Sequence, residues 1–327
     1  MKSVKNSWGS SIKDGEYQRK ESQFRNWITP DGSAGITGNG GFQAEEGRYH
    51  LYVSLACPWA HRTLIFRQLK GLEDLITVSV VHPVMHENGW SFKHDEESAK
   101  RYGTTGDDLY GDNFIAEKYL SQDPDYSGVN SVPILWDKKD KVIVNNESSE
   151  IIRMFNSAFN DITGNTLDFY PEQLREKIDQ ENELVYHKIN NGVYKTGFAT
   201  TQEAYDKNVK ELFIALEQLE EKLTKQRYLA GDEITEADWR LWATLVRFDS
   251  VYHTHFKCNL KLIKEFSNIY NYMLELYQVP NVAKTVNEAH IKCHYYASHL
   301  AINPYGIIPI SHKQDWTVPH HRDTKFT

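Results

Sequence analysis

Residues 48–82 carry the pattern that most restricts how this chain can fold. RYHLYVS (48–54) is rich in aromatic and β-branched residues, which is typical of a strand. Cys57 and Pro58 follow, and the next thirteen letters, WAHRTLIFRQLKG, keep their apolar residues near helical spacing. LITVSVVH (75–82) predicts a second strand. A strand–helix–strand unit of this length predicts two parallel strands joined by a helical crossover.

The rest of the chain predicts two short strands and then helices. VPILW (132–136) and KVIV (141–144) indicate strands joined by a turn, and Asn146 is placed to cap the following helix. Within residues 205–223 the apolar side chains recur on one helical face, and ITEADWRL (234–241) opens with a capping-box pattern. We therefore expect an N-terminal α/β domain with few strands, followed by an all-helical domain.

Composition indicates where these parts begin and end. Residues 1–47 are polar, rich in Gly and Ser and without periodicity, so we expect order to begin at Arg48. The predicted parts are a polar N-terminal extension (1–47), an α/β domain (48–160) with a long insertion (84–130), a helical domain (171–310) and a C-terminal tail (311–327).

Length and charge exclude several classes of protein. The chain has 327 residues, of which 40% are hydrophobic and 25% charged, enough to bury a core without disulfides. The net charge of −8 argues against nucleic-acid binding, which needs a basic surface. The chain has no long apolar run for a membrane span and no apolar segment for a secretory signal. With only three cysteines, these features predict a cytoplasmic protein without a disulfide framework.

Cys57 is the main candidate nucleophile. It would stand at the start of a helix, where unpaired backbone N–H groups and the helix dipole favour negative charge. Such a position lowers a thiol pKa and produces a reactive thiolate. Ala60 occupies the place of a second cysteine, so an external thiol would have to resolve any disulfide on Cys57. The alternative is a buried structural cysteine, which the strand–Cys–Pro–helix setting makes less favourable.

Two dipeptides further along the chain would suit a site for a thiol peptide. Val132-Pro133 precedes a strand, and a cis bond there would present the Val132 backbone to an extended ligand. Glu147-Ser148 opens a helix, where the hydroxyl could hold a carboxylate and the Glu an ammonium group. Each has a plain alternative, an edge-strand proline and an ordinary helix cap. No spacing of His and Cys residues matches a metal site, and none is expected.

Taken in this order, these features resemble a glutathione transferase, and more narrowly its Xi class, the glutathionyl-hydroquinone reductases. The resemblance spans roughly residues 48–310 and implies a thioredoxin-like domain followed by a helical domain of the glutathione transferase type. The stretches that carry it are LYVSLACPWAHRTLI (51–65), VNNESSEIIRMFN (144–156), INNGVYKTGFA (189–199), ITEADWRL (234–241), RFDSVYHTHFKCN (247–259), HIKCHYYASH (290–299) and INPYGIIP (302–309).

The resemblance implies roles for residues of the α/β domain. Cys57 matches the family's nucleophile, and Trp90 a residue that packs on glutathione. Val132 matches the backbone clamp on the cysteinyl part, while Glu147 and Ser148 match the residues that hold the γ-glutamyl end.

Tyrosines are implied as the remaining catalytic residues. Tyr194, in NGVYKTG, matches the tyrosine that gives a proton to the quinol. Tyr252 and Tyr295 match tyrosines near the thiol that stabilise its thiolate, with Tyr295 chosen over its neighbour Tyr296.

One segment departs from the family pattern. Before the Val-Pro, family members carry an arginine in a segment of the form SGRxTVP, whereas this chain has SGVNSVP. Val129, Asn130 and Ser131 are therefore expected along the glutathione site without the charge of that arginine. Lys118 or Arg101 could supply the charge instead.

The implied enzyme uses glutathione as co-substrate and aromatic quinol conjugates as substrates, and forms a homodimer. Two alternatives stay open. One is an omega-like thiol transferase or dehydroascorbate reductase that acts through the same Cys57. The other is a non-catalytic module that uses this fold to bind partners.

Overall fold

The structure is a computed structural model that describes residues 12–310 and 314–326. The first eleven residues, residues 311–313 and residue 327 lie outside this description, so parts of the expected extension and tail are not covered. The described chain forms two compact units. Of the described residues, the first contains Lys20–Asp168 together with Thr285–Ser298, and the second contains residues 12–19, Phe169–Lys284, 299–310 and 314–326.

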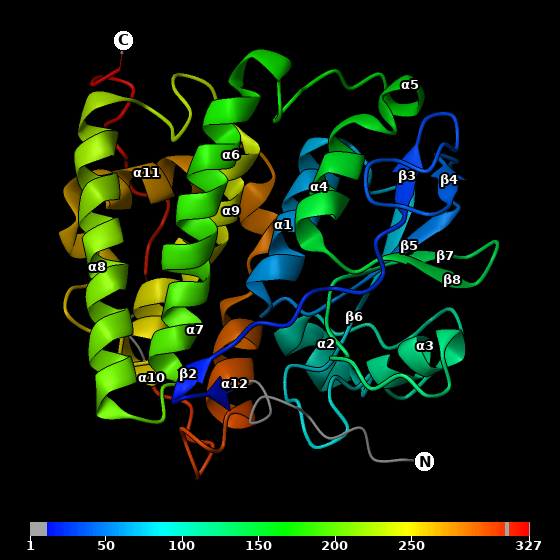
Figure 1. Ribbon diagram of the computed structural model, residues 1–327, viewed down its shortest axis with the longest axis horizontal. Helices are drawn as coiled ribbons and strands as arrows, with labels where there is room; N and C mark the ends of the chain where they lie inside the picture. The colour runs from blue at the N-terminus through cyan, green and yellow to red at the C-terminus, as the bar shows by residue number, and fades with distance from the viewer. Residues whose placement is uncertain (1–11, 311–313, 327) are drawn as a thin grey trace. The chain divides into compact units, whose positions relative to one another are not determined.

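A four-stranded sheet forms the centre of the first unit (Figure 1). Its order is β6-β5-β7-β8, with β5 parallel to β6 and antiparallel to β7, and with β7 antiparallel to β8. The strand–helix–strand prediction is therefore confirmed, and so are the two later strands. The strands are β5 (Tyr49–Val53), β6 (Ile76–Val80), β7 (Ile134–Asp137) and β8 (Val142–Asn145).

Two helices of the first unit pack against each other (Figure 1). Both carry buried apolar side chains, among them Ile65 and Phe66 on one helix and Ile151 and Phe155 on the other. The two helices are α1 (Pro58–Leu69) and α4 (Ser148–Ser157). The N-cap of α4 is Glu147, whose carboxylate accepts a hydrogen bond from the Ser149 amide at 3.1 Å. Asn146 was expected to be this cap. That prediction was wrong, because the Asn146 side chain is used by bonds to distant parts of the chain.

Order begins earlier than the sequence suggested. β3 (Trp27–Thr29) and β4 (Gly41–Gln43) form a parallel pair, and the Asn26 amide donates to the Val144 carbonyl at 3.0 Å. The side chains of Arg25 and Glu150 form an ion pair. Residues 20–47 thus belong to the first unit, where Trp27 and Ile28 of β3 are buried. The buried part of this segment is too short to give a periodic signal in the sequence. The domain limits 48–160 and 171–310 stay predictions.

The long insertion between β6 and β7 contains two short helices, α2 (Glu96–Tyr102) and α3 (Ile115–Gln122). A capping box of Asp95 and Ser98 starts α2. Lys118 on α3 is buried and ion-paired with Asp107 at 2.8 Å and Asp112 at 2.7 Å. Ile115, Ala116 and Tyr119 of α3 are buried as well, so ion pairs and apolar packing together hold the insertion. Both helices are short, which is why the sequence carried little helical signal for them.

The second unit is helical, as expected, and its long α8 (Gln202–Lys225) contains the predicted amphipathic stretch. A short antiparallel pair, β1 (Ile12–Lys13) and β2 (Glu16–Tyr17), also belongs to it. Its other helical segments are η2 (Glu172–Leu174), α6 (Arg175–Leu184), η3 (Val185–Asn190), α7 (Asn191–Gly197), α9 (Glu236–Arg247), η4 (Phe248–Tyr252), α10 (His253–His255), η5 (Ile263–Glu265) and α11 (Ser267–Gln278). Outside it lie α5 (Asn160–Thr163) and α12 (Glu288–Ser298) of the first unit, and η6 (Val282–Thr285) ends at the boundary.

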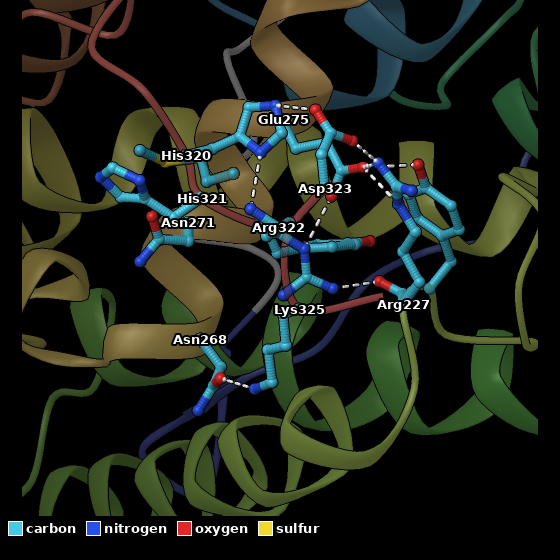
Figure 2. Close-up of polar contacts among 12 residues, drawn as sticks. Arg227, Asn268, Asn271, Glu275, His320, His321, Arg322, Asp323 and Lys325 are labelled. Atoms are coloured by element: carbon cyan, nitrogen blue, oxygen red, sulfur yellow. Dashed lines mark hydrogen bonds and ion pairs between the residues drawn. The ribbon is translucent and has the colours of Figure 1, made fainter. Parts of the chain in front are cut away.

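The described end of the chain is anchored on α11 (Figure 2). The buried Arg322 donates to the Glu275 carboxylate at 2.6 Å and to the Arg227 carbonyl. Lys325 donates to Asn268 Oδ1 at 2.6 Å. This part of the polar tail therefore packs on the helical unit.

Asp238 completes the predicted capping box of α9 and does more than cap it. Its carboxylate accepts hydrogen bonds from the amides of Leu229 and Thr235, from the Thr235 hydroxyl and from the Tyr272 hydroxyl, at 2.7–3.1 Å. Asp238 is fully buried, so no solvent water is at hand to accept these hydrogen bonds in place of its carboxylate.

In the part of the chain that the structure describes, no helix is long and apolar enough to cross a membrane.

We predict that Asp238→Ala lowers the free energy of unfolding by about 3 kcal/mol, because it leaves several buried donors unpaired. Thr201→Ala, which removes a single N-cap bond from α8, should cost about 1 kcal/mol. Urea unfolding of both variants measures the difference. Equal losses would show that Asp238 acts only as a helix cap.

Candidate active site

Cys57 lies at the N-cap of α1, with Pro58 in the first helical turn. Its backbone is extended, and its amide donates to the Ser54 carbonyl at 3.1 Å. Its thiol is partly exposed and donates to the Val132 carbonyl, with Sγ 3.4 Å from the oxygen. The sulfur thus lies at the positive end of the α1 dipole, where a thiolate is favoured.

The other two thiols have a different environment. The three cysteines, all within the described residues, form no disulfide. Cys258 and Cys293 are buried, and burial raises the pKa of both thiols. Of the three sulfurs, Cys57 is therefore the one placed for nucleophilic chemistry.

The segment beside Cys57 is held by a buried tyrosine. The Val132–Pro133 peptide bond is cis, as the sequence suggested. The Tyr119 hydroxyl donates to the Ser131 carbonyl at 2.9 Å and accepts from Asn146 Nδ2 at 3.1 Å. Tyr119 thus connects the segment before β7 with the turn that leads into α4, so the Val132 carbonyl keeps its place opposite the thiol.

Glu147 and Ser148 lie together at the start of α4, as expected. The Ser22 hydroxyl donates to Glu147 Oε2 at 3.0 Å, so the N-terminal segment contributes to this corner. The Ser148 side chain is 2% exposed, and its Oγ has no hydrogen-bond partner among the described residues. An unpaired hydroxyl at a helix N-terminus suits an anion such as a carboxylate.

The segment SGVNSVP shows a second unpaired atom. Asn130 Oδ1 is buried and bonds to nothing else within residues 12–310 and 314–326. It is an acceptor, so it would fit an N–H donor of a ligand and not the carboxylate that an arginine would bind. Val129 is exposed, and its carbonyl accepts from the Tyr126 hydroxyl at 3.2 Å.

Of the two suggested substitutes for the missing arginine, Lys118 is already ion-paired. Lys118 is committed to Asp107 and Asp112, and its ammonium lies 4.3 Å from the centre of the Tyr110 ring. The Arg101 guanidinium lies over the Tyr102 ring, 5.2 Å from its centre. The idea that Lys118 supplies the charge was wrong, because a buried ion pair already uses it.

Trp90 is buried and stacked on His294, with the ring centres 4.5 Å apart and an angle of 28° between the planes. His294 is on α12, and its Nδ1 donates to the Pro83 carbonyl at 2.9 Å. The neighbouring Tyr295, like Tyr296, is buried, and its ring centre lies 5.2 Å from that of His294. Sequence patterns assign His294 no role in the site, although its four-residue spacing from His290 indicates that both lie on one helix face.

The two remaining tyrosines lie in the second unit. Tyr194, on α7, and Tyr252, at the end of η4, have ring centres 6.1 Å apart. Both rings lie within 6 Å of Phe256, and Tyr17 approaches Tyr194 to 6.1 Å. The four rings are buried and form one aromatic cluster. In the described residues no group of three or more His, Cys, Asp or Glu side chains could hold a metal ion.

A sheet of this order, with a cysteine starting its crossover helix and a helical unit after it, defines a glutathione transferase. Family models agree: the N-terminal domain of glutathione S-transferase matches residues 56–158, and the C-terminal domain matches residues 202–275. The chain belongs to the glutathione transferase family, and the fold expected from the sequence is confirmed.

Relatives place the chain within the Xi class. It is 56% identical to the glutathionyl-hydroquinone reductase YqjG of Escherichia coli (strain K12) over 312 residues, 95% of this chain and 94% of that protein. It is 48% identical to the glutathionyl-hydroquinone reductase PcpF of Sphingobium chlorophenolicum over 300 residues, with 92% and 91% covered.

Solved structures agree with this assignment. The glutathione-bound structure of YqjG has a TM-score of 0.90 with this chain, covering 93% of it and 97% of that chain. The glutathione transferase Xi of Phanerochaete chrysosporium has a TM-score of 0.87 and 50% identity, covering 94% and 96%. The resemblance to the Xi class drawn from the sequence is thereby confirmed, while the roles of the single site residues stay predictions.

We predict that iodoacetamide modifies the native protein at Cys57 and leaves Cys258 and Cys293 unmodified, because the latter two are buried and their thiols hold their protons. Peptide mass spectrometry after a timed reaction at pH 7 measures this. Cys57→Ser should abolish modification. Equal labelling of all three thiols would contradict the assignment.

Proposed function

We propose that this protein reduces glutathionyl-hydroquinones to hydroquinones, with glutathione as co-substrate. The observation that supports this most is the placement of a single reactive cysteine at the N-cap of α1, opposite the Val132 carbonyl. Ala60 stands where a dithiol enzyme would carry its second cysteine, so the disulfide formed must be resolved by a thiol from solution. The kinship with YqjG and PcpF supports the same reaction.

In the first half of the proposed reaction, the Cys57 thiolate attacks the sulfur of the glutathionyl group. The bond between that sulfur and the ring carbon breaks, and its electron pair goes to the carbon. Tyr194 supplies the proton that this carbon takes up. The hydroquinone leaves, and Cys57 carries glutathione in a mixed disulfide.

In the second half, the thiolate of another glutathione attacks the glutathione sulfur of the mixed disulfide. The products are oxidised glutathione and the Cys57 thiolate. Because the first product leaves before the second glutathione reacts, the kinetics are of the ping-pong type.

The proposed binding roles follow the chemistry of each group. Glu147 binds the ammonium group of glutathione, and the unpaired Ser148 hydroxyl binds the neighbouring carboxylate. The Val132 backbone pairs with the cysteinyl part, and Trp90 packs on the peptide. Asn130, with Val129 and Ser131, lines the site, and Asn130 Oδ1 accepts from an N–H of the ligand.

Tyr252 and Tyr295 are proposed to donate hydrogen bonds that favour the charged form of the thiol. We also propose that the enzyme is a cytoplasmic homodimer that serves to detoxify quinones. The domain limits proposed for it remain 48–160 for the glutathione-binding part and 171–310 for the part that carries the quinol site.

An omega-like thiol transferase is the second candidate. In its first step the Cys57 thiolate attacks the glutathione sulfur of a substrate mixed disulfide and releases the substrate thiolate; its second step is the same resolution of the Cys57 mixed disulfide by glutathione. This reaction needs no proton at a ring carbon, so Tyr194 distinguishes the two functions.

We predict that Ser148→Ala weakens glutathione binding about tenfold, the loss of one hydrogen bond to a charged group. The same change should leave the thermal stability of the ligand-free protein unchanged or raised, because it removes an unpaired buried hydroxyl. Calorimetric titration and thermal unfolding measure the two effects. Ser157→Ala, on the exposed end of α4, is the matched control. A loss of stability without weaker binding would show that Ser148 is structural.

We predict that the wild type releases menadiol from glutathionyl-menadiol in the presence of glutathione and that Cys57→Ala does not. Intact mass should show a glutathione adduct on Cys57. Tyr194→Phe should slow menadiol release about a hundredfold, the usual contribution of a general acid, but leave reduction of a glutathione mixed disulfide unchanged. Tyr205→Phe, whose hydroxyl binds the Lys257 carbonyl, is the control. Wild-type activity on the mixed disulfide alone would favour the thiol transferase.

A further inference from the structure

Helix α12 is remote in sequence from Cys57 but belongs to the same unit. It packs against α2 (Figure 1). Its His290 side chain is completely buried and bonds to two separate segments. Nδ1 lies 2.8 Å from the carbonyl oxygen of Tyr102, at the end of α2, and Nε2 lies 3.1 Å from the hydroxyl oxygen of Ser54.

These two contacts determine which ring nitrogen of His290 carries the proton. A carbonyl oxygen only accepts hydrogen bonds, so Nδ1 must be the N–H that faces Tyr102. In the neutral ring Nε2 is then an acceptor, and the Ser54 hydroxyl donates to it. The ring thereby fixes the direction of the Ser54 O–H bond.

Ser54 in turn holds the backbone that leads into α1. Its hydroxyl oxygen accepts from the Ala56 amide at 3.2 Å, and its carbonyl accepts from the Cys57 amide at 3.1 Å. The turn of residues 54–57 is therefore held twice by one serine. A change at Ser54 would move Cys57 Sγ relative to the amides of α1 and to the Val132 carbonyl, 3.4 Å away.

We propose that His290 is a positioning residue for the Cys57 thiol and that it acts through Ser54. The role of the Cys57 thiol in turnover rests on the proposed function. The position of the thiol in the structure does not depend on that function. His290 Nε2 accepts a hydrogen bond from the Ser54 hydroxyl, and Ser54 keeps the 54–57 turn in place. The turn holds the sulfur at the helix N-terminus, where its charged form is favoured.

Two neighbouring contacts fix the helix that carries His290. Thr285, just before α12, bonds through Oγ1 to His61 Nε2 of α1 at 2.7 Å. His294, one helical turn after His290, stacks on Trp90 and donates to the Pro83 carbonyl. The helix is thus attached to α1 and to the segment after β6, so His290 meets Ser54 in one defined position.

The test measures the rate of Cys57 alkylation by iodoacetamide between pH 5 and pH 10, by intact mass. It needs no quinol substrate, so absence of reductase activity in the wild type would not affect its outcome. We expect His290→Phe and Ser54→Ala each to slow alkylation at pH 7 about tenfold and to shift the pH profile upward by about one unit. His290→Gln, which offers an acceptor near the position of Nε2, should restore part of the rate.

Non-additivity tests the route through Ser54. The double variant His290→Phe/Ser54→Ala should react no more slowly than Ser54→Ala alone, because Ser54→Ala already removes the contact with His290 together with the bond from the Ala56 amide. An additive loss would overturn the route through Ser54.

His50→Phe is the matched control, since His50 is also buried in the first unit and bonds to Thr77 Oγ1 at 2.7 Å. It should lower thermal stability and leave the alkylation profile unchanged. A stable His290→Phe with the wild-type profile would overturn the proposal. If His290→Phe fails to fold, Ser54→Ala and His290→Gln decide: a wild-type profile for Ser54→Ala would overturn it equally.

Discussion

The partial positive charge at the start of α1 is the interaction on which the candidate site of the first unit depends. It favours negative charge on one sulfur only while that sulfur stays at the helix N-cap. The contacts around Cys57 all serve this placement: the amide bond to Ser54, the thiol contact with Val132 and the sheet order that brings β7 beside β5. Burial has the opposite effect on Cys258 and Cys293, whose thiols keep their protons.

Unpaired polar atoms mark the second side of the candidate site. Buried hydroxyl and amide oxygens normally have partners, because leaving one unpaired costs free energy. Ser148 Oγ and Asn130 Oδ1 depart from this rule at the start of α4 and before β7. A ligand such as glutathione would give each atom a partner: its carboxylate would accept from the Ser148 hydroxyl, and one of its N–H groups would donate to Asn130 Oδ1. The unpaired atoms lower the stability of the ligand-free protein, and pairing them with the ligand would add the same free energy to binding.

Much of the fold could be predicted from the sequence, since it depends on local patterns. The strand–helix–strand unit, α8 and the Thr235–Asp238 capping box were confirmed. Errors arose where a polar side chain had a distant partner. Asn146 looked like a cap but bonds to Tyr119 and to the backbone of Phe24, and Lys118 looked available but is paired with Asp107.

The sequence by itself determined the helix start at Cys57-Pro58 and the helical periodicity after Pro171, because each lies in residues near one another in the chain. It also determined the family, because several local motifs follow one another in a characteristic order. The tertiary structure alone decided which side chains support Cys57. His290 reaches Ser54 across 236 positions of the chain, and His294 stacks on Trp90. Such contacts depend on how α12 packs in the first unit. Local periodicity in the sequence predicts helices and strands, but it does not predict which buried donor bonds to which acceptor.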